Sequence, residues 1–224
     1  MMISFENVPK DEMEALCTPM HCILPRLETS GSTPSSSTRH TPIQAALPPT
    51  NGSKAPQDPS RRVRGALYLG SMAAAYDHDL LREHHITHLV QVLETPWAPQ
   101  QDPDDFEQAS APNKLHYHRI DIEDRTTAAL GQHLSAACDY VENALADGEN
   151  VLVHCQQGVS RSASIIIAFL IRQNHMSCDA AYAFVKERRR CIRPNSGFLK
   201  ALHEWETACN KIRPQLEGRR SLSA

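Results

Sequence analysis

The chain has 224 residues, of which 41% are hydrophobic, and a formal net charge of −3 at pH 7. Such a length allows one domain of about 150 residues with a single substantial core, plus a tail. The near-neutral charge argues against nucleic-acid binding, and no apolar run reaches the roughly 18 residues needed to span a bilayer. The polar first residues do not fit a secretory signal, and an odd count of 7 cysteines suits free thiols. We therefore expect a reducing compartment, the cytoplasm, the nucleus or both.

The first sixty residues have the composition of a disordered tail. More than half of the chain's 15 prolines fall there, and Gly31–His40 is almost entirely small and polar. Such a segment cannot bury enough apolar surface to offset the entropy of ordering. We predict a disordered N-terminal tail over residues 1–60, a folded domain over residues 61–212, and a flexible C-terminal tail over residues 213–224.

The predicted domain opens with basic residues, 61–64, followed by Leu67 and Leu69. Basic residues before a Leu-x-Leu pattern are similar to a docking motif for MAP kinases, whose acidic grooves would attract them. The two leucines also suit one side of a first strand, which would place them in the core. We favour the strand, with docking to a MAP kinase as the alternative.

A helix and a second strand are expected next. Ser71 or Asp77 can cap the helix, and the apolar run that ends at Leu93 predicts the strand. Residues 94–113 are rich in Pro, Gln and Asp without apolar periodicity, so we expect a long surface loop. A third strand over residues 115–120 then leads into an acidic cluster of Asp121, Glu123 and Asp124.

Two further helices are predicted from apolar spacing. Apolar residues from Leu130 to Leu145 are spaced to lie on one face of a helix, and Gly148 is expected to end that helix. Ser177 suits an N-cap, and the helix that it begins ends in the basic run Lys186–Arg190. That run could steer phosphorylated partners, or it could be an ordinary solvated helix end.

The strongest signal lies between a buried strand over residues 151–153 and an apolar helix over residues 164–171. A turn centred on Gly158 joins them, and this arrangement directs backbone N–H groups and a helix N-terminus at one point. Cys155 would be driven toward thiolate there, and Arg161 can offer two parallel N–H donors to a phosphate. The turn therefore predicts an anion site that contains a nucleophile.

Strands and helices that alternate around a buried central strand predict an α/β fold. Since the anion loop follows the carboxyl end of that strand, we expect a three-layer αβα domain with a mainly parallel sheet. A last helix that carries Leu199, Leu202 and Trp205 is expected to close the core.

Three motifs resemble one known family. The run from His154 to Ser162 is similar to the signature loop of the cysteine-based protein phosphatases, in their dual-specificity branch. Residues 67–71 and 193–198 are similar to the opening and closing motifs of that family. The resemblance covers about residues 61–212 and implies a phosphotyrosine protein phosphatase-like fold.

The resemblance implies a role for each site residue. Cys155 would be the nucleophile, Ser162 would stabilise the departing thiolate, and His154 would orient the cysteine. Arg161 would hold the phosphate together with the loop residues Gln156, Gln157, Gly158, Val159 and Ser160. Asn195 resembles the asparagine that bonds back to the loop. No metal and no organic cofactor is implied.

The general acid is the least determined of these residues. Asp124 matches it by position relative to Cys155, with Asp121 and Glu123 as competitors. Arg125 beside Asp124 could hold that carboxylate ionised, which would count against the role.

The implied function is hydrolysis of phosphotyrosine and phosphoserine/threonine in proteins through a cysteinyl-phosphate, by a monomer. The expected partner is a phosphorylated protein, and neither nucleic acid nor a membrane is expected as a partner. Two alternatives stay open: a phosphatase of RNA 5′ phosphates, phosphoinositides or glucans, and a non-catalytic adaptor that binds a phosphorylated partner.

Overall fold

The structure, a computed structural model, describes residues 19–27, 64–94 and 115–220. A five-stranded sheet in the order β1-β2-β5-β3-β4 forms its middle layer. The strands are β1 (Met20–Leu24), β2 (Leu67–Ser71), β3 (Ile86–Leu93), β4 (His116–Asp121) and β5 (Asn150–Cys155). Only the β1–β2 pair is antiparallel, and the pairs β2–β5, β5–β3 and β3–β4 are parallel. The sheet is therefore mainly parallel, as predicted.

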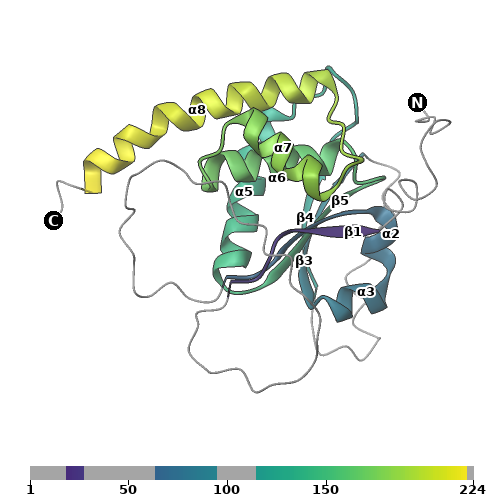
Figure 1. The fold of residues 1–224 in the computed structure, drawn as a ribbon. Coiled ribbons are helices and arrows are strands. Elements are labelled where there is room, and N and C mark those ends of the chain that lie inside the picture. The colour runs from purple at the N-terminus through teal and green to yellow at the C-terminus, as the bar shows by residue number, and fades with distance from the viewer. Residues whose placement is uncertain (1–18, 28–63, 95–114, 221–224) are drawn as a thin grey trace.

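Helices cover both faces of this sheet (Figure 1). The short helices α2 (Met72–Tyr76) and α3 (His78–Glu83) lie on one face. The other face carries the longer ones, α5 (Gly131–Ala146), α6 (Arg161–Gln173), α7 (Cys178–Arg188) and α8 (Ser196–Arg220). The predicted three-layer αβα fold is confirmed.

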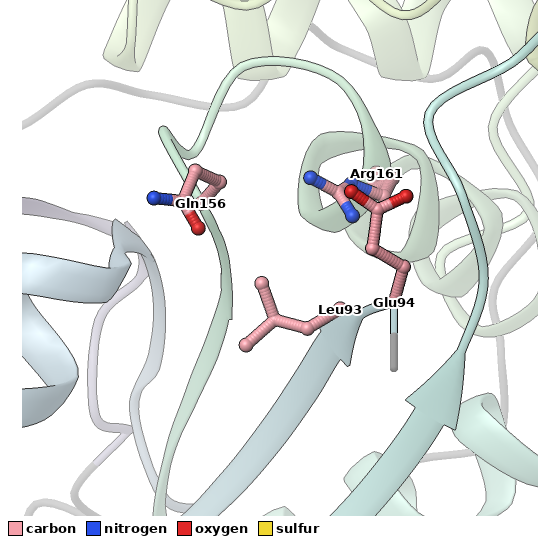
Figure 2. Close-up of a pocket in the computed structure, with 4 residues that line it drawn as sticks. All are labelled: Leu93, Glu94, Gln156 and Arg161. Carbon is pink, nitrogen blue, oxygen red and sulfur yellow. The ribbon is translucent and has the colours of Figure 1, made fainter. Parts of the chain in front are cut away.

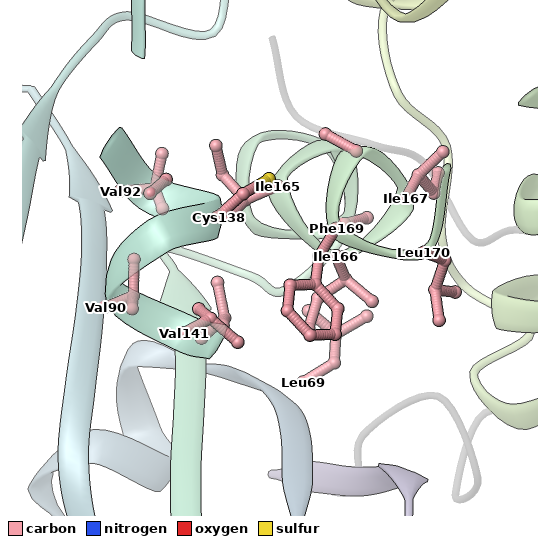
Figure 3. Close-up of a cluster of buried hydrophobic side chains, with 14 of the residues drawn as sticks. Leu69, Val90, Val92, Cys138, Val141, Ile165, Ile166, Ile167, Phe169 and Leu170 are labelled. Atoms are coloured by element: carbon pink, nitrogen blue, oxygen red, sulfur yellow. The ribbon is translucent and has the colours of Figure 1, made fainter. Parts of the chain in front are cut away.

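The central strand β5 contributes to two cores. Leu152 packs in the smaller core with α2 and α3, whereas Val151 and Val153 face the larger core under α5 to α8. Such alternation in a wholly buried strand is expected where helices cover both faces. Helix α6 is buried from residue 161 to residue 171, so it runs through the middle of the larger core (Figure 3). The strand and helix that flank the anion loop are thus both fixed by burial.

The predicted helix ends are found at polar or glycine residues. Asp77 accepts a hydrogen bond from the N–H of Leu80 and caps α3, and Ser177 accepts one from the N–H of Ala180 and caps α7. Gly148 follows α5 with a φ of 84°, a conformation that side chains with a Cβ disfavour. Ser71 precedes α2 without a side-chain cap, so of the two proposed caps only Asp77 acts as one.

Strand β1 overturns part of the predicted tail. Residues 20–24 pair with β2, and Met20 and Ile23 are buried. The prediction of disorder is wrong for this segment because β2 offers it an unpaired edge and the sheet offers it apolar contacts. The rest of residues 1–60, outside 19–27, lies beyond the described ranges.

Helix α8 also differs from its prediction. It continues to Arg220, through most of the segment assigned to a flexible C-terminal tail. The predicted end at residue 212 was the end of the family resemblance.

Leu67 and Leu69 are both 0% exposed within β2, which confirms the strand interpretation of this motif. Arg64 forms an ion pair with Glu142, and residues 61–63 lie outside the described ranges. The surface loop predicted over residues 94–113 likewise lies outside them beyond Glu94. Over the ranges that are described, no helix is both long and apolar enough to cross a membrane.

Candidate active site

Cys155 is the last residue of β5, directly before the loop that leads into α6. Its sulfur accepts hydrogen bonds from the N–H of Gly158 and from the hydroxyl of Ser162, both at 3.2 Å. Burial by itself raises the pKa of this thiol, but the hydroxyl and N–H of Ser162, the charge of Arg161 and the N–H of Gln157 outweigh it. The pKa of Cys155 is therefore lowered, which favours the reactive thiolate.

The loop directs its carbonyl groups away from the sulfur. Met72 N–H donates to the carbonyl of residue 156, Arg193 N–H to that of residue 159, and Ser164 N–H to that of residue 160. The carbonyls of residues 157 and 158 accept from the Arg189 side chain. Because each carbonyl from 156 to 160 has an outside donor, the intervening N–H groups are left to face the sulfur and its anion site.

Gly158 allows this path. Its φ is +68°, and a Cβ at this position would lie 2.6 Å from the carbonyl oxygen of Gly70. Both the conformation and the close approach of β2 therefore require glycine. The predicted turn centred on this residue is present.

Arg161, the first residue of α6, is 7% exposed. One guanidinium nitrogen, Nη1, donates to the carbonyl of Ile122 at 3.3 Å, and Nε has no partner among the described residues. The side chain lines a pocket with Leu93, Glu94 and Gln156 (Figure 2). A buried guanidinium with an unpaired N–H at a pocket beside a thiolate fits a phosphate site.

Asp124 lies at the same site, although it stands thirty-one residues before Cys155 in the chain. Its Oδ1 accepts from the hydroxyl of Ser160 at 2.7 Å and from Nδ2 of Asn195 at 2.8 Å. The first contact ties the carboxylate directly to the loop. The second shows that the Asn195 side chain binds Asp124, while only its backbone N–H reaches the loop, at Ser160 Oγ.

The competing carboxylates are placed differently. Glu123 forms an ion pair with Arg125, so that arginine neutralises Glu123. Asp121 is the last residue of β4 and is exposed. Asp124 is held at the loop by the hydroxyl of Ser160, whereas Glu123 is paired with Arg125.

His154 precedes the nucleophile and is 1% exposed. Burial, opposed by a contact with the backbone of Cys155, lowers the pKa of its imidazole to about 4, so the ring is neutral. Neither ring nitrogen finds a hydrogen-bond partner in the part of the chain that is described. No side-chain hydrogen bond of His154 within the described ranges supports its predicted orienting role, which stays a prediction.

Two residues at the site were missed by the sequence analysis. Arg189 was assigned to a solvated basic run, yet it is 1% exposed and bonds to the loop. Its spacing was a usable signal, because it follows Ala181 and Val185 at steps of four, on the buried face of α7. Glu94 was grouped with a surface loop, and no local pattern marks it as a neighbour of Arg161.

Comparison with known proteins agrees with this geometry. Residues 67–208, more than half of the chain, match the family model "Dual specificity phosphatase, catalytic domain". A Drosophila melanogaster protein named dual specificity protein phosphatase MPK-4 is 35% identical over 155 residues, which are 69% of this chain. The chain spans about a third of the length of the first curated relatives that it matches, 29% and 38% of two of them.

Solved structures give the same result. Human DUSP28 matches with 31% identity and a TM-score of 0.56, over 64% of this chain and 90% of that one. A human tyrosine phosphatase-like serine/threonine/tyrosine-interacting protein matches with 29% identity and a TM-score of 0.54, over 63% and 91%. The family match covers more than half of the chain, and it shows that the chain belongs to the dual-specificity phosphatase family.

Proposed function

We propose that the protein hydrolyses phosphotyrosine and phosphoserine/threonine esters in proteins through a cysteinyl-phosphate. One observation carries this proposal: the Cys155 sulfur accepts hydrogen bonds from Gly158 N–H and Ser162 hydroxyl, at a helix N-terminus that also carries Arg161. A thiolate stabilised beside a phosphate-binding guanidinium is the arrangement that nucleophilic attack on phosphorus requires.

In the first step, the Cys155 thiolate attacks phosphorus in line with the leaving oxygen. Arg161 and the N–H groups of the loop bind the equatorial oxygens, where negative charge is held in the transition state. Asp124 donates a proton to the departing alkoxide or phenoxide. Since both recorded contacts to Asp124 are made at Oδ1, we assign the proton transfer to Oδ2.

In the second step, water attacks the phosphocysteine. Asp124, now a carboxylate, removes a proton from this water, and the S–P bond breaks to give inorganic phosphate and the Cys155 thiolate. The Ser162 hydroxyl lies 3.2 Å from the sulfur and donates to it as its charge returns.

The pocket favours a protein monoester over a polyanionic substrate. Glu94 lines the pocket together with Arg161 (Figure 2). The negative charge of Glu94 in this pocket repels substrates with several phosphates, such as phosphoinositides or RNA 5′ ends. A single phosphorylated side chain brings one phosphate and is less affected.

A second candidate function is an adaptor that binds a phosphorylated partner without cleaving it. It is favoured by one structural relative, which is named as a phosphatase-like interacting protein. Against it stand the contacts to Cys155 and the hydrogen bonds that place Asp124 at the loop, neither of which binding alone requires.

The test is a phosphatase assay on purified protein with para-nitrophenyl phosphate and with phosphotyrosine and phosphothreonine peptides. We expect hydrolysis by the wild type and a loss of about 10,000-fold or more in Cys155→Ser, with retained affinity for the peptides. Rapid quench at acidic pH should trap phosphate on Cys155. Peptide binding by wild type without any release of phosphate would instead establish the adaptor.

The pH profile supplies a second check. Ionisation of Cys155 should make kcat/KM rise with pH. Because the pKa of Cys155 is lowered, the midpoint of this rise should lie below the ordinary thiol pKa. Loss of the Asp124 proton should then make kcat/KM fall again. A bell on the acid side of neutrality is expected. A rate that still rises through pH 9 contradicts this pair of roles.

A further inference from the structure

A buried arginine lies behind the loop, on the side away from the phosphate site. Arg189 directly follows α7 and is 1% exposed. Its Nε donates to the carbonyl of Gly158 at 2.9 Å, and its Nη2 to the carbonyl of Gln157 at 3.2 Å. Its Nη1 lies 2.7 Å from Nδ1 of His21 in β1. A guanidinium suits this place because its planar fork holds several donors in fixed directions.

One of these contacts reaches the nucleophile through a single peptide group. The carbonyl of Gln157 and the N–H of Gly158 belong to the same peptide unit. Its oxygen accepts from Arg189, and its N–H donates to the sulfur of Cys155 at 3.2 Å. A rigid peptide plane bonded at both ends cannot rotate without breaking one bond. Polarisation of the carbonyl by a charged donor also strengthens the N–H as a donor.

The third contact joins the loop to the N-terminal strand. Since Arg189 Nη1 donates, Nδ1 of His21 must accept and its ring must be neutral. Burial, and then the charge of Arg189, lower the pKa of His21, in agreement with that state. Strand β1 is antiparallel to β2, with His21 opposite Leu69, and it lies before the segment that the family model matches.

We propose that Arg189 is a positioning residue for Cys155, which holds the Gln157–Gly158 peptide with its N–H toward the sulfur, and that β1 holds Arg189 through His21. This proposal rests on the proposed function, in which Cys155 is the nucleophile. It makes the N-terminal strand part of the support of the active site.

Electrostatics point the same way. Burial lowers the pKa of Arg189, while charge on Cys191 and on Cys155 raises it. Charge on Cys155 is thus felt at Arg189, and the coupling is reciprocal, so the guanidinium favours the thiolate. The ionisable groups around the sulfur also include Arg161 on α6, the neutral His154 on β5, and Cys191, whose pKa is raised by charge on Cys155.

The test measures the ionisation of Cys155 without using turnover. The full chain is alkylated with iodoacetamide at a series of pH values, and mass spectrometry follows the peptide that contains Cys155. We expect Arg189→Met to raise the midpoint of alkylation by about one pH unit. At pH values below the midpoint, the fraction of Cys155 present as thiolate should therefore fall about tenfold. Arg189→Lys should give a smaller rise, because an ammonium keeps the charge but not the fork.

Variants at His21 test the link to β1. His21→Leu removes the acceptor and should raise the midpoint in the same direction, by less than Arg189→Met does. His21→Asn offers a side-chain oxygen to the guanidinium and should restore the wild-type midpoint. A wild-type midpoint in folded His21→Leu would remove β1 from the proposal.

Arg172→Met is the matched control. Arg172 also bonds to a carboxylate and a carbonyl, those of Asp139 and Ser135, but on the part of α6 remote from the loop. The Arg172→Met change should lower the melting temperature and leave the midpoint of Cys155 alkylation unchanged. An unchanged midpoint in Arg189→Lys and Arg189→Met, at melting temperatures no lower than that of this control, overturns the proposal.

The outcome is separable from that of the proposed function. If the wild type hydrolyses no phosphoester but the midpoint still shifts in the Arg189 variants, the proposed function fails and the positioning role stands. If Arg189→Met does not fold, Arg189→Lys and His21→Leu decide the question by the same measurement.

Discussion

The two halves of the site are held in place by different means. In the loop half, Cys155 and Arg161 are 2% and 7% exposed, and backbone or buried donors satisfy the loop carbonyls. In the acid half, Asp124 is exposed and is held at one oxygen by the side chains of Ser160 and Asn195. Cys155, the proposed nucleophile, is thus fixed by the interior of the fold, whereas Asp124, the proposed acid, depends on two side chains that can be changed singly.

This contrast has a chemical reason. A thiolate and a phosphate need charge stabilisation that is already in place before reaction, and burial with fixed donors supplies it. A general acid donates its proton in the first step and takes one from the attacking water in the second, so contact with water serves it. Mutations in the two halves should therefore have different effects, since only in the acid half should the loss of rate depend on the leaving group.

The largest effect is expected from Asp124→Asn. With an alkyl or unsubstituted phenyl phosphate, whose leaving oxygen needs a proton, kcat should fall about 1,000-fold. With a phosphate ester of an acidic phenol the loss should be small. The falling limb of the pH profile should disappear, and the midpoint of Cys155 alkylation should not move. An equal loss for good and poor leaving groups would place Asp124 outside the proton transfer.

Gly158→Ala should act on the loop half. The added Cβ meets the Gly70 carbonyl and disfavours the φ of +68°, so the loop N–H groups shift from their positions. We expect kcat/KM to fall about 100-fold for good and poor leaving groups alike, since a displacement of this kind affects every substrate. Inhibition by inorganic phosphate should weaken in parallel.

Gly131→Ala is the control for that change. A Cβ at Gly131, the first residue of α5, meets nothing within 4 Å. Alanine there should leave the activity unchanged and the melting temperature equal or slightly higher. If both glycine variants lost activity alike, the close approach of β2 to the loop would not be the cause.

The loop half of the site could be predicted from local sequence, whereas the acid half could not. Cys155, Gly158 and Arg161 lie within seven positions between a buried strand and a buried helix, so their chemistry could be read locally. Asp124 was chosen from a cluster of carboxylates by resemblance alone. What separates it from Glu123 is a tertiary hydrogen bond, Ser160 to Asp124, which no local pattern contains.

The misses also have physical causes. Strand β1 is five residues long and lies between Pro19 and Pro25, so its composition resembled that of the tail around it. Its order comes from pairing with β2, a partner more than forty residues away along the chain. The charge of Arg189 favoured a partner-steering or solvated basic run, although its spacing from Ala181 and Val185 continues the buried face of α7.

Asn195 should give a smaller effect than Gly158. Asn195→Ala removes one donor to Asp124, and we expect kcat with a poor leaving group to fall about tenfold, as for one hydrogen bond to a charged group. The change also removes the acceptor for Phe198 N–H at the start of α8, which should cost about 1 kcal/mol of stability.

Asn195→Asp separates those two roles. It keeps an acceptor for Phe198 N–H, so the melting temperature should be close to that of wild type. It loses the donor and brings a like charge to Asp124, so the falling limb of the pH profile should move to higher pH. A wild-type profile in this variant would show that the contact does not reach the acid.

The smallest effect is expected from Glu123→Gln. Glu123 is paired with Arg125, and their side chains are 46% and 67% exposed, so the pair contributes little to stability in water. We expect less than about a twofold change in kcat for good and poor leaving groups, and no change in either limb of the pH profile. Arg125→Ala should behave in the same way, because its partner is Glu123. A large loss with poor leaving groups in Glu123→Gln, beside a small one in Asp124→Asn, would transfer the acid role to Glu123 and reverse the order of effects in this half of the site.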